Sequence, residues 1–148
     1  MKKVTYLTES AKKFSREEAI AEAKRCLLCE EAYCNKKCPI NSNPKEFVEL
    51  VATEQFDKAI GLIRDNNPLF YSICTRVCPY DSYCVGGCRN SKLADDPIMI
   101  PFIQKYLVDY CDETDEIISS GNVEPKKVGQ KVAIIGSGPA GLAAAAVL

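Results

Sequence analysis

Residues 26–39 read CLLCEEAYCNKKCP, and the four cysteines of this block decide the fold. Their spacing is Cys26-x2-Cys29-x4-Cys34-x3-Cys38, with Pro39 directly after the last. A Cys-x2-Cys pair brings two thiolates together from one turn of backbone, whose amides can also donate hydrogen bonds to sulfur. The proline stops the chain from continuing as a helix and turns it away. The block therefore predicts a loop that holds metal through thiolates.

A second cysteine block, residues 74–88, reads CTRVCPYDSYCVGGC. Both blocks contain Cys-x3-Cys and Cys-Pro elements and supply four cysteines each, which indicates a weak internal duplication. Eight cysteines match two four-ligand iron–sulfur clusters, and, as in bacterial ferredoxin runs, the cysteine before proline is expected to serve the other cluster. The predicted first set is Cys26, Cys29, Cys34 and Cys88. The second is Cys38, Cys78 and Cys84, with Cys74 as the simplest fourth ligand because positions i and i+4 share a helix face.

Two zinc sites are the alternative interpretation, because four cysteines are a common structural zinc set. Zinc sites usually combine two Cys-x2-Cys knuckles, and this chain has only one such pair, which favours iron–sulfur clusters. The ninth cysteine, Cys111, has no partner by spacing and is interpreted as a core or incidental thiol.

Composition excludes several other classes of protein. The 148 residues contain nine cysteines and no histidine, so imidazole takes part in no catalytic or metal site. The amino-terminal decapeptide lacks the apolar core of a signal peptide, which predicts a cytoplasmic location and argues against disulfides. A net charge of −1 gives no electrostatic reason to expect nucleic acid or an anionic membrane as a partner. No apolar run is long enough to span a membrane.

Helices are predicted around both blocks. Ser15 and Glu18 form a capping-box pattern that starts a helix from about Arg16 toward Cys29. Apolar residues at helical spacing predict a hairpin of two helices between the blocks; they are Phe47, Val48, Val51, Phe56, Ala59, Ile60 and Ile63. A further helix is expected after Pro101, running to about Cys111.

The carboxy-terminal residues change character sharply. Residues 112–130 are acidic and then Gly- and Pro-punctuated, and are interpreted as a linker between domain 1–111 and residues 131–148. In that last segment a buried strand, Val132 to Ile135, precedes a glycine turn and an alanine-rich helix. The turn fits the dinucleotide-binding pattern G-x-G-x-x-G in the required context; its residues are Gly136, Ser137, Gly138, Pro139, Ala140 and Gly141. The expected architecture is a mainly helical two-cluster domain followed by the start of a Rossmann-like fold. We expect the segment to be an incomplete nucleotide-binding fold, because a lone strand and helix cannot bury their faces.

The motifs, taken together, resemble the N-terminal iron–sulfur domain of the glutamate synthase small subunit and dihydropyrimidine dehydrogenase family. The resemblance rests on AKRCLLCEEAYCNKKCP, on RDNNPLFYSICTRVCPYDSYCVGGC, and on VAIIGSGPAG after a linker. The second stretch looks closest to the dihydropyrimidine dehydrogenase branch, including its bacterial flavin-binding subunit.

The resemblance implies two 4Fe–4S clusters ahead of a domain that binds FAD and NAD(P)H. Electrons from reduced nicotinamide would enter FAD, pass through the clusters and reach a partner catalytic subunit or domain. In the dihydropyrimidine dehydrogenase branch one cluster has a glutamine ligand at the position that here is Gln104. On that reading Gln104 replaces Cys74, which becomes a buried non-ligand. The sequence alone favours interpreting Gln104 as a polar residue on the exposed side of its helix, and only the register of the resemblance puts it level with Cys74 as the fourth ligand.

Two functions of different classes remain. The first is an electron-transfer module of an NAD(P)H- and FAD-dependent oxidoreductase. The second is a non-redox, zinc-stabilised docking domain for a catalytic subunit. No acid–base pair or nucleophile suggests substrate chemistry in this chain, and Glu17, Glu18 and Glu22 are interpreted as solvated helix faces.

Overall fold

The computed structural model describes residues 13–66, 71–114, 129 and 131–148. In these residues the regular structure is helical. The helices are α1 (Arg16–Lys24), α2 (Tyr33–Lys37), α3 (Pro44–Ala52), α4 (Phe56–Asn66), α5 (Tyr71–Val77), the 3-10 turn η1 (Tyr80–Ser82), α6 (Arg89–Ala94), α7 (Ile100–Thr114) and α8 (Pro139–Val147). The prediction of a mainly helical domain is confirmed.

Helix α1 begins as predicted but ends early. Ser15 accepts a hydrogen bond from the Glu18 N–H while the Glu18 carboxylate bonds the Ser15 N–H, which completes the capping box. The helix stops at Lys24 rather than continuing toward Cys29, so that part of the prediction is wrong. Leu28 takes a left-handed conformation (φ 47°), and a helix cannot pass through such a residue. The first cysteine loop is therefore free to turn.

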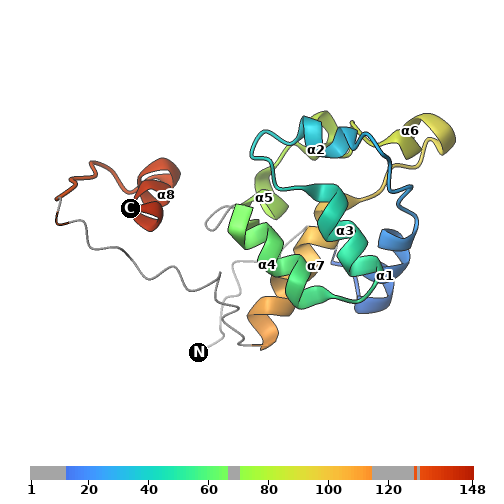
Figure 1. Ribbon diagram of the computed structural model, residues 1–148, viewed down its shortest axis with the longest axis horizontal. Helices are drawn as coiled ribbons and strands as arrows, with labels where there is room; N and C mark the ends of the chain where they lie inside the picture. The colour runs from blue at the N-terminus through green and yellow to red at the C-terminus, as the bar shows by residue number, and fades with distance from the viewer. Residues whose placement is uncertain (1–12, 67–70, 115–128, 130) are drawn as a thin grey trace, which may run out of the picture.

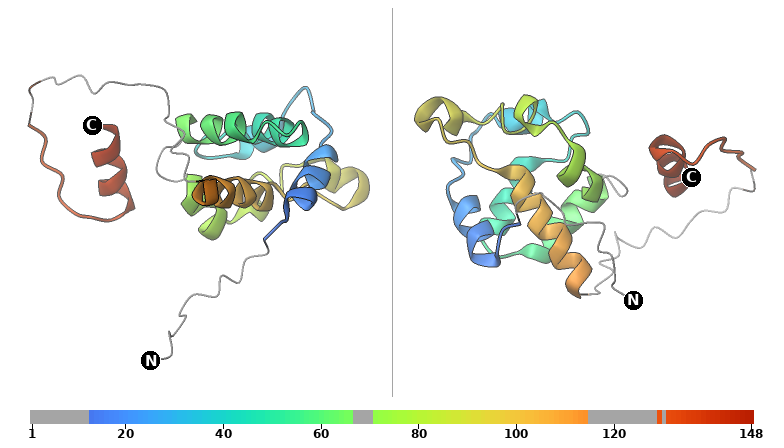
Figure 2. Two further views of the ribbon diagram at one scale, coloured as in Figure 1. Left: turned by 90° about the horizontal axis from the view of Figure 1, so that it is seen from below. Right: turned by 180° about the vertical axis from the view of Figure 1, so that it is seen from behind.

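The core lies between two layers of helices. Helices α3 and α4 lie side by side in one layer, and α7 and α5 form a second layer beneath it (Figure 2). The apolar residues predicted for the helical hairpin are all buried, and they pack with α1 and α7 residues such as Ala19, Ile103 and Leu107. Burying about 100 Å² of apolar side chain contributes about 2.5 kcal/mol, so this core holds the helices in place.

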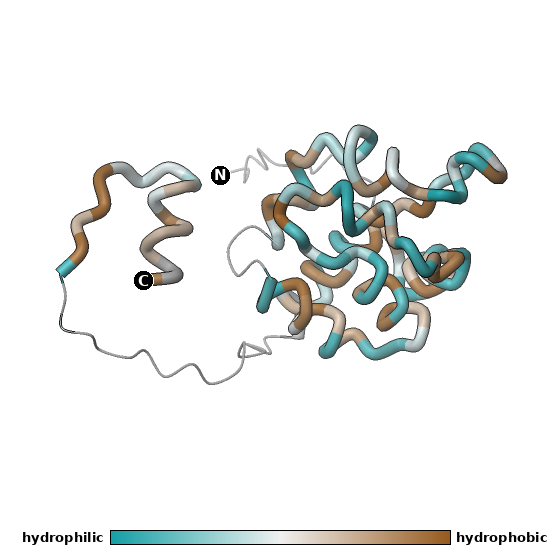
Figure 3. The backbone as a smooth tube through the Cα atoms, turned by 45° about the horizontal axis from the view of Figure 1, so that its top comes forward, coloured by the Kyte–Doolittle hydropathy of each residue, from teal (hydrophilic) through white to brown (hydrophobic). Residues whose placement is uncertain are grey.

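Hydrophobic and hydrophilic stretches alternate along these helices, as the hydropathy-coloured tube shows (Figure 3). Helix α7 starts at Ile100, one residue before Pro101, and reaches Thr114. Proline in the first turn is tolerated because its missing N–H has no helical partner there. The helix therefore extends over the first three residues assigned to the linker, and most of that predicted linker lies outside the described residues.

The cysteine blocks lie at one end of the domain. Helix α2, which contains Cys34 of the first block, and helix α6, which follows Cys88 of the second, both lie at that end (Figure 1). Asn43, directly before α3, has φ 55°, a conformation that asparagine tolerates better than most residues. Its side chain does not cap the helix but joins Asn35 of α2 and Glu46 of α3. This polar link fixes the first block on the end of α3.

Residues 131–148 contain one helix, α8, which begins at Pro139 after Gly138. The strand predicted for residues 132–135 does not form in this structure. Strand pairing needs a neighbouring strand to satisfy backbone N–H and C=O groups, and the described residues supply none.

Candidate metal centres

The first cavity lies between the two cysteine blocks. It is lined by Cys26, Cys29 and Cys34 of the first block and by Cys88 of the second. Apolar side chains complete the wall; they include Leu27, Val48, Ile98 and Ile100. We call this cavity the first thiol pocket. The structure brings together the four cysteines of the first predicted set.

Local backbone features place these thiols. Burial raises the pKa of the Cys26 thiol, and the nearby Leu28 backbone, which takes a left-handed turn, partly offsets that rise. Gly87 lets the second block approach α2 closely, since a Cβ on it would lie 3.0 Å from the Tyr33 carbonyl oxygen. Cys88 follows Gly87 directly and so reaches the pocket that Cys34 of α2 also lines.

The second cavity is lined by Cys38, Cys74, Cys78, Cys84 and Gln104, and we call it the second thiol pocket. Cys38 comes from the first block, so each pocket takes thiols from both blocks. The Ser42 N–H donates to the Cys38 sulfur at 3.4 Å, and the Ser42 hydroxyl lies 3.2 Å from it. Ser42 is buried and belongs to the pocket wall. Sequence reasoning missed it, because a serine four residues after a cysteine carries no signal.

Gln104 is 7% exposed, so the interpretation of this residue as a polar group on the outside of its helix is wrong. Its side-chain N–H donates to the Tyr71 carbonyl at 2.8 Å. Because the amide nitrogen of Gln104 is used in this hydrogen bond, the amide oxygen is the atom available to a metal. Cys74 lines the same pocket, so both candidates for the fourth ligand are present there.

Burial raises the pKa values of several pocket thiols. The pKa of Cys34 and that of Cys74 are each raised to about 11, and that of Cys84 to about 12, with burial as the main cause and neighbouring thiols adding to it. Burial disfavours the charged thiolate, and a second thiolate nearby disfavours it further. A positively charged metal centre removes both penalties, because the thiolate is the form that binds metal.

The two pockets are neighbours. Ile100, at the start of α7, lines both of them and is 4% exposed. The pKa of Cys84 in the second pocket is raised in part by Cys34 in the first, which places these two thiols within electrostatic reach of each other. A buried aliphatic side chain therefore forms a shared wall between the two thiol groups.

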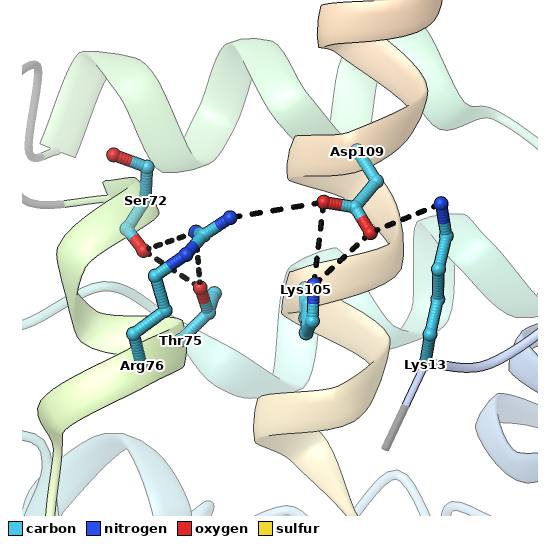
Figure 4. Close-up of polar contacts among 6 residues, drawn as sticks. All are labelled: Lys13, Ser72, Thr75, Arg76, Lys105 and Asp109. Atoms are coloured by element: carbon cyan, nitrogen blue, oxygen red, sulfur yellow. Dashed lines mark hydrogen bonds and ion pairs between the residues drawn. The ribbon is translucent and has the colours of Figure 1, made fainter. Parts of the chain in front are cut away.

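Ion pairs hold the helices that carry the pockets. The Asp109 carboxylate on α7 forms ion pairs with Lys105 at 3.1 Å, Lys13 at 3.4 Å and Arg76 of α5 at 3.9 Å. Figure 4 shows the three cations around this carboxylate. Arg76 also donates to the Ser72 carbonyl. The network ties α5, which carries Cys74, to α7.

Glu22 makes a similar link beside the first pocket. Its side chain is 13% exposed, bonds Arg25 and accepts from the Met99 N–H at 2.8 Å. The interpretation of Glu22 as a solvated residue is therefore wrong, whereas Glu17 and Glu18 are exposed as expected. Arg25 also donates a hydrogen bond to the Asp96 carbonyl and forms an ion pair with the Asp96 carboxylate. These contacts join α1 to the segment that precedes α7, and no sequence motif marks them.

The glycine turn before α8 is tight. Gly136 has φ 104°, a region that favours glycine. A Cβ on Gly141 would lie 2.1 Å from the Gly136 carbonyl oxygen, so only glycine allows this close approach. The six predicted nucleotide-binding residues are exposed or half-buried. No helix in the described residues is long and apolar enough to cross a membrane.

Comparisons with known proteins agree with this architecture. Residues 3–116 match the family model of dihydropyrimidine dehydrogenase domain II, 4Fe-4S cluster. The chain is 40% identical over 149 aligned residues to the NAD-dependent dihydropyrimidine dehydrogenase subunit PreT of Escherichia coli (strain K12), covering 100% of this chain and 35% of that protein. It is 38% identical over 136 residues to the glutamate synthase (NADPH) small chain of the same organism, covering 91% of this chain and 28% of that protein.

The chain spans about a third of the length of these curated relatives. The family match covers both cysteine blocks and every helix from α1 to α7. The chain belongs to the family of dihydropyrimidine dehydrogenase domain II, the 4Fe-4S cluster domain.

Proposed function

We propose that the chain holds two 4Fe–4S clusters and carries electrons within an NAD(P)H- and FAD-dependent oxidoreductase of the dihydropyrimidine dehydrogenase type. The observation that carries the proposal is the sorting of eight cysteines into two groups of four, each around its own cavity. The family match supports the kind of cluster, and identity along the whole chain to the subunit PreT supports the type of enzyme.

The donor sets fit such clusters. Soft thiolates are the usual ligands of iron–sulfur clusters. The proposed first ligand set is Cys26, Cys29, Cys34 and Cys88. The proposed second set is Cys38, Cys78, Cys84 and Gln104, with Cys74 as the alternative to Gln104. The apolar walls limit the access of water, and hydrogen bonds to sulfur and burial are the features by which a protein adjusts the potential of such a site.

A 4Fe–4S cluster supplies one-electron transfer when it is bound. The chain's own residues supply the rest. The Ser42 N–H donates to the sulfur of Cys38, which stabilises the thiolate. Ile100 lines both thiol pockets, so its aliphatic side chain is shared by the surroundings of the two thiol groups. This arrangement suits a relay between neighbouring redox centres.

For residues 131–148 we propose a role as the first strand, glycine turn and helix of an FAD-binding domain, joined to the helical domain by a linker that follows α7. The φ of Gly136 and the close approach at Gly141 support it. A catalytic subunit or domain that accepts the electrons is the proposed partner, in line with the word subunit in the name of PreT.

The competing function is a zinc-stabilised docking domain. Four thiolates around one zinc ion lie about 3.7 Å from each other, as Zn–S bonds of about 2.3 Å require. Among the described residues, no three histidine, cysteine, aspartate or glutamate side chains form a group that fits a single metal ion. Thiols spread around a cavity suit a larger cluster, in which each thiolate binds a different iron.

The test is the iron and acid-labile sulfide content of the anaerobically purified chain, together with its absorption spectrum. About eight irons and eight sulfides per chain are expected for two clusters. Bound zinc without sulfide or visible absorption would overturn the proposal and leave the docking function.

Serine variants assign the pockets. Cys34→Ser and Cys84→Ser should each reduce the iron content to about four per chain, because each removes a ligand of one four-iron site. Cys111→Ser is the matched control, since Cys111 is a buried thiol of the core that lines neither pocket. Gln104→Ala and Cys74→Ser then decide the fourth ligand of the second site by which of them changes its electron paramagnetic resonance (EPR) signal.

A further inference from the structure

A surface cavity adjoins the first thiol pocket. It is lined by Tyr33, Lys37, Gly86, Gly87, Arg89 and Lys92. Tyr33, Gly87 and Arg89 line the first thiol pocket as well, so one wall separates the two cavities. We call the surface cavity the basic cavity.

The charged residues that line the basic cavity are all positive. Three of its six lining residues are cationic and none carries a carboxylate, although the chain as a whole has a net charge of −1. Within the described residues, Lys37, Arg89 and Lys92 form no ion pair shorter than 4.0 Å. By contrast, Arg16 and Arg25 each lie within 3 Å of a carboxylate. The positive charge of the cavity is therefore not cancelled by an ion pair with the described fold.

Tertiary packing brings these positive charges together from two helices. Lys37 belongs to α2, whereas Arg89 and Lys92 belong to α6, and the two helices lie at the same end of the domain (Figure 1). The Arg89 guanidinium lies over the Tyr33 ring at 5.2 Å, which holds it at the cavity wall. The Glu31 carboxylate forms an ion pair with Lys36 at 3.4 Å, and Arg89 lies within electrostatic reach of it and contributes to its lowered pKa without forming an ion pair.

Apolar side chains are exposed on the elements that form these two cavities. Leu27, which lines the first thiol pocket, is 50% exposed, and Leu93, which follows Lys92 in α6, is 73% exposed. Protein interfaces combine an apolar centre with arginine and a polar rim, whereas a small phosphate ion gains nothing from exposed leucines. The combination of leucines and cations therefore favours a protein surface as the occupant.

We propose that the basic cavity docks an acidic surface of a partner protein that exchanges electrons with the first thiol pocket. The inference rests on the proposed function, since it needs a redox centre in that pocket. One electron crosses at a time, so the chain is oxidised by one electron and a one-electron acceptor on the partner is reduced by one. No bond is made or broken. Opposite charges on the two proteins speed their encounter.

The first experiment uses small electron acceptors of opposite charge. The iron-loaded, reduced chain is mixed with ferricyanide, an anion, or with hexaamminecobalt(III), a cation, and oxidation is followed by stopped-flow absorbance. We expect K37Q/K92Q to slow the reaction with ferricyanide about 3- to 10-fold at low ionic strength and not to slow the reaction with the cobalt cation. High salt should abolish the difference, because charges are screened within about 3 Å at 1 M.

The matched control is K24Q/K58Q, which removes the same charge from exposed positions on α1 and α4. If it slows the reaction with ferricyanide as much as K37Q/K92Q does, only net charge matters and the docking site is wrong. Iron and sulfide counts accompany each rate. A chain without clusters overturns the proposed function, whereas a loaded chain without charge discrimination overturns only this inference.

The second experiment measures binding without using redox chemistry. A fluorescently labelled poly-L-glutamate peptide is titrated with the full chain at low salt. We expect saturable binding that K37Q/K92Q weakens at least 5-fold and K24Q/K58Q leaves within 2-fold, in line with the contribution of a few close charges. Absence of binding refutes the inference. Tighter binding of inorganic pyrophosphate than of the peptide also refutes it, because the cavity is then a small-anion site.

Discussion

Replacing Asp109 by asparagine removes the carboxylate on which Lys105, Lys13 and Arg76 converge. The Lys105 side chain is 1% exposed and lies 3.1 Å from that carboxylate. Asparagine keeps the shape of the side chain, so the change isolates the charge. We expect a marked loss of stability, because a buried ammonium that loses a charged partner keeps its desolvation cost.

The magnitude follows from burial. Removing one partner of a fully buried pair costs about 3–5 kcal/mol. Asp109 is 14% exposed, so water can replace part of the lost interaction, and we expect about 2–3 kcal/mol. That is a factor of about 30 to 140 in the folding equilibrium. With a typical urea slope, the midpoint falls by about 1–2 M.

The assay is anaerobic urea unfolding followed by far-ultraviolet circular dichroism. Asp57→Asn is the control: Asp57 is exposed on α4, so it should change the free energy of unfolding by less than about 0.5 kcal/mol. Adding Lys105→Met to Asp109→Asn should recover at least half of the loss, because it removes the buried charge. Equal midpoints for Asp109→Asn and Asp57→Asn, or no recovery in the double variant, would refute the reasoning.

Three further predictions concern the cap, the tight turn and the wall between the pockets. Ser15→Ala should lower the free energy of unfolding by about 1 kcal/mol by removing the α1 capping box, measured by the same urea assay. Gly86→Ala should lower the free energy of unfolding by about 2–3 kcal/mol and reduce iron retention, because the added Cβ would lie 2.0 Å from the Asp81 carbonyl oxygen. Gly61→Ala is the control, since a Cβ at Gly61 meets open space. Ile100→Ala should alter the magnetic interaction between the two clusters, which EPR measures. Ile103 is buried on the same helix but lines neither pocket, so Ile103→Ala should only destabilise the fold. Identical EPR spectra for the two variants would contradict the shared wall.

Much of the helical domain was predictable because local signals and burial agree. Ser15 and Glu18 marked the start of α1 through a capping pattern that acts within four residues. The apolar positions from Phe47 to Ile63 marked two helices through a period that only a buried helix face explains. The end of α1 was not predicted, because Leu28 adopts a left-handed conformation that a leucine in the sequence does not indicate.

The site was predictable only in its chemistry. Cysteine spacing and the two Cys-Pro elements indicated thiolate sites, and the structure places eight of those cysteines around two cavities. Glu22, Ser42 and Asp109 carried no signal, because each acts through partners distant in sequence or too common to form a motif.

The sequence by itself determined the donor types, the helix starts and the composition of the glycine turn, since these depend on neighbouring residues. Tertiary structure decided that Gln104 is buried in the pocket that Cys74 also lines, that Ile100 lines both pockets, and that α2 and α6 bring positive charges together. Among the residues that the structure describes, 132–135 have no strand to pair with, so the predicted strand is not seen there. Burial, shared walls and summed charge arise only when distant segments meet, and a strand exists only where another strand completes its hydrogen bonds.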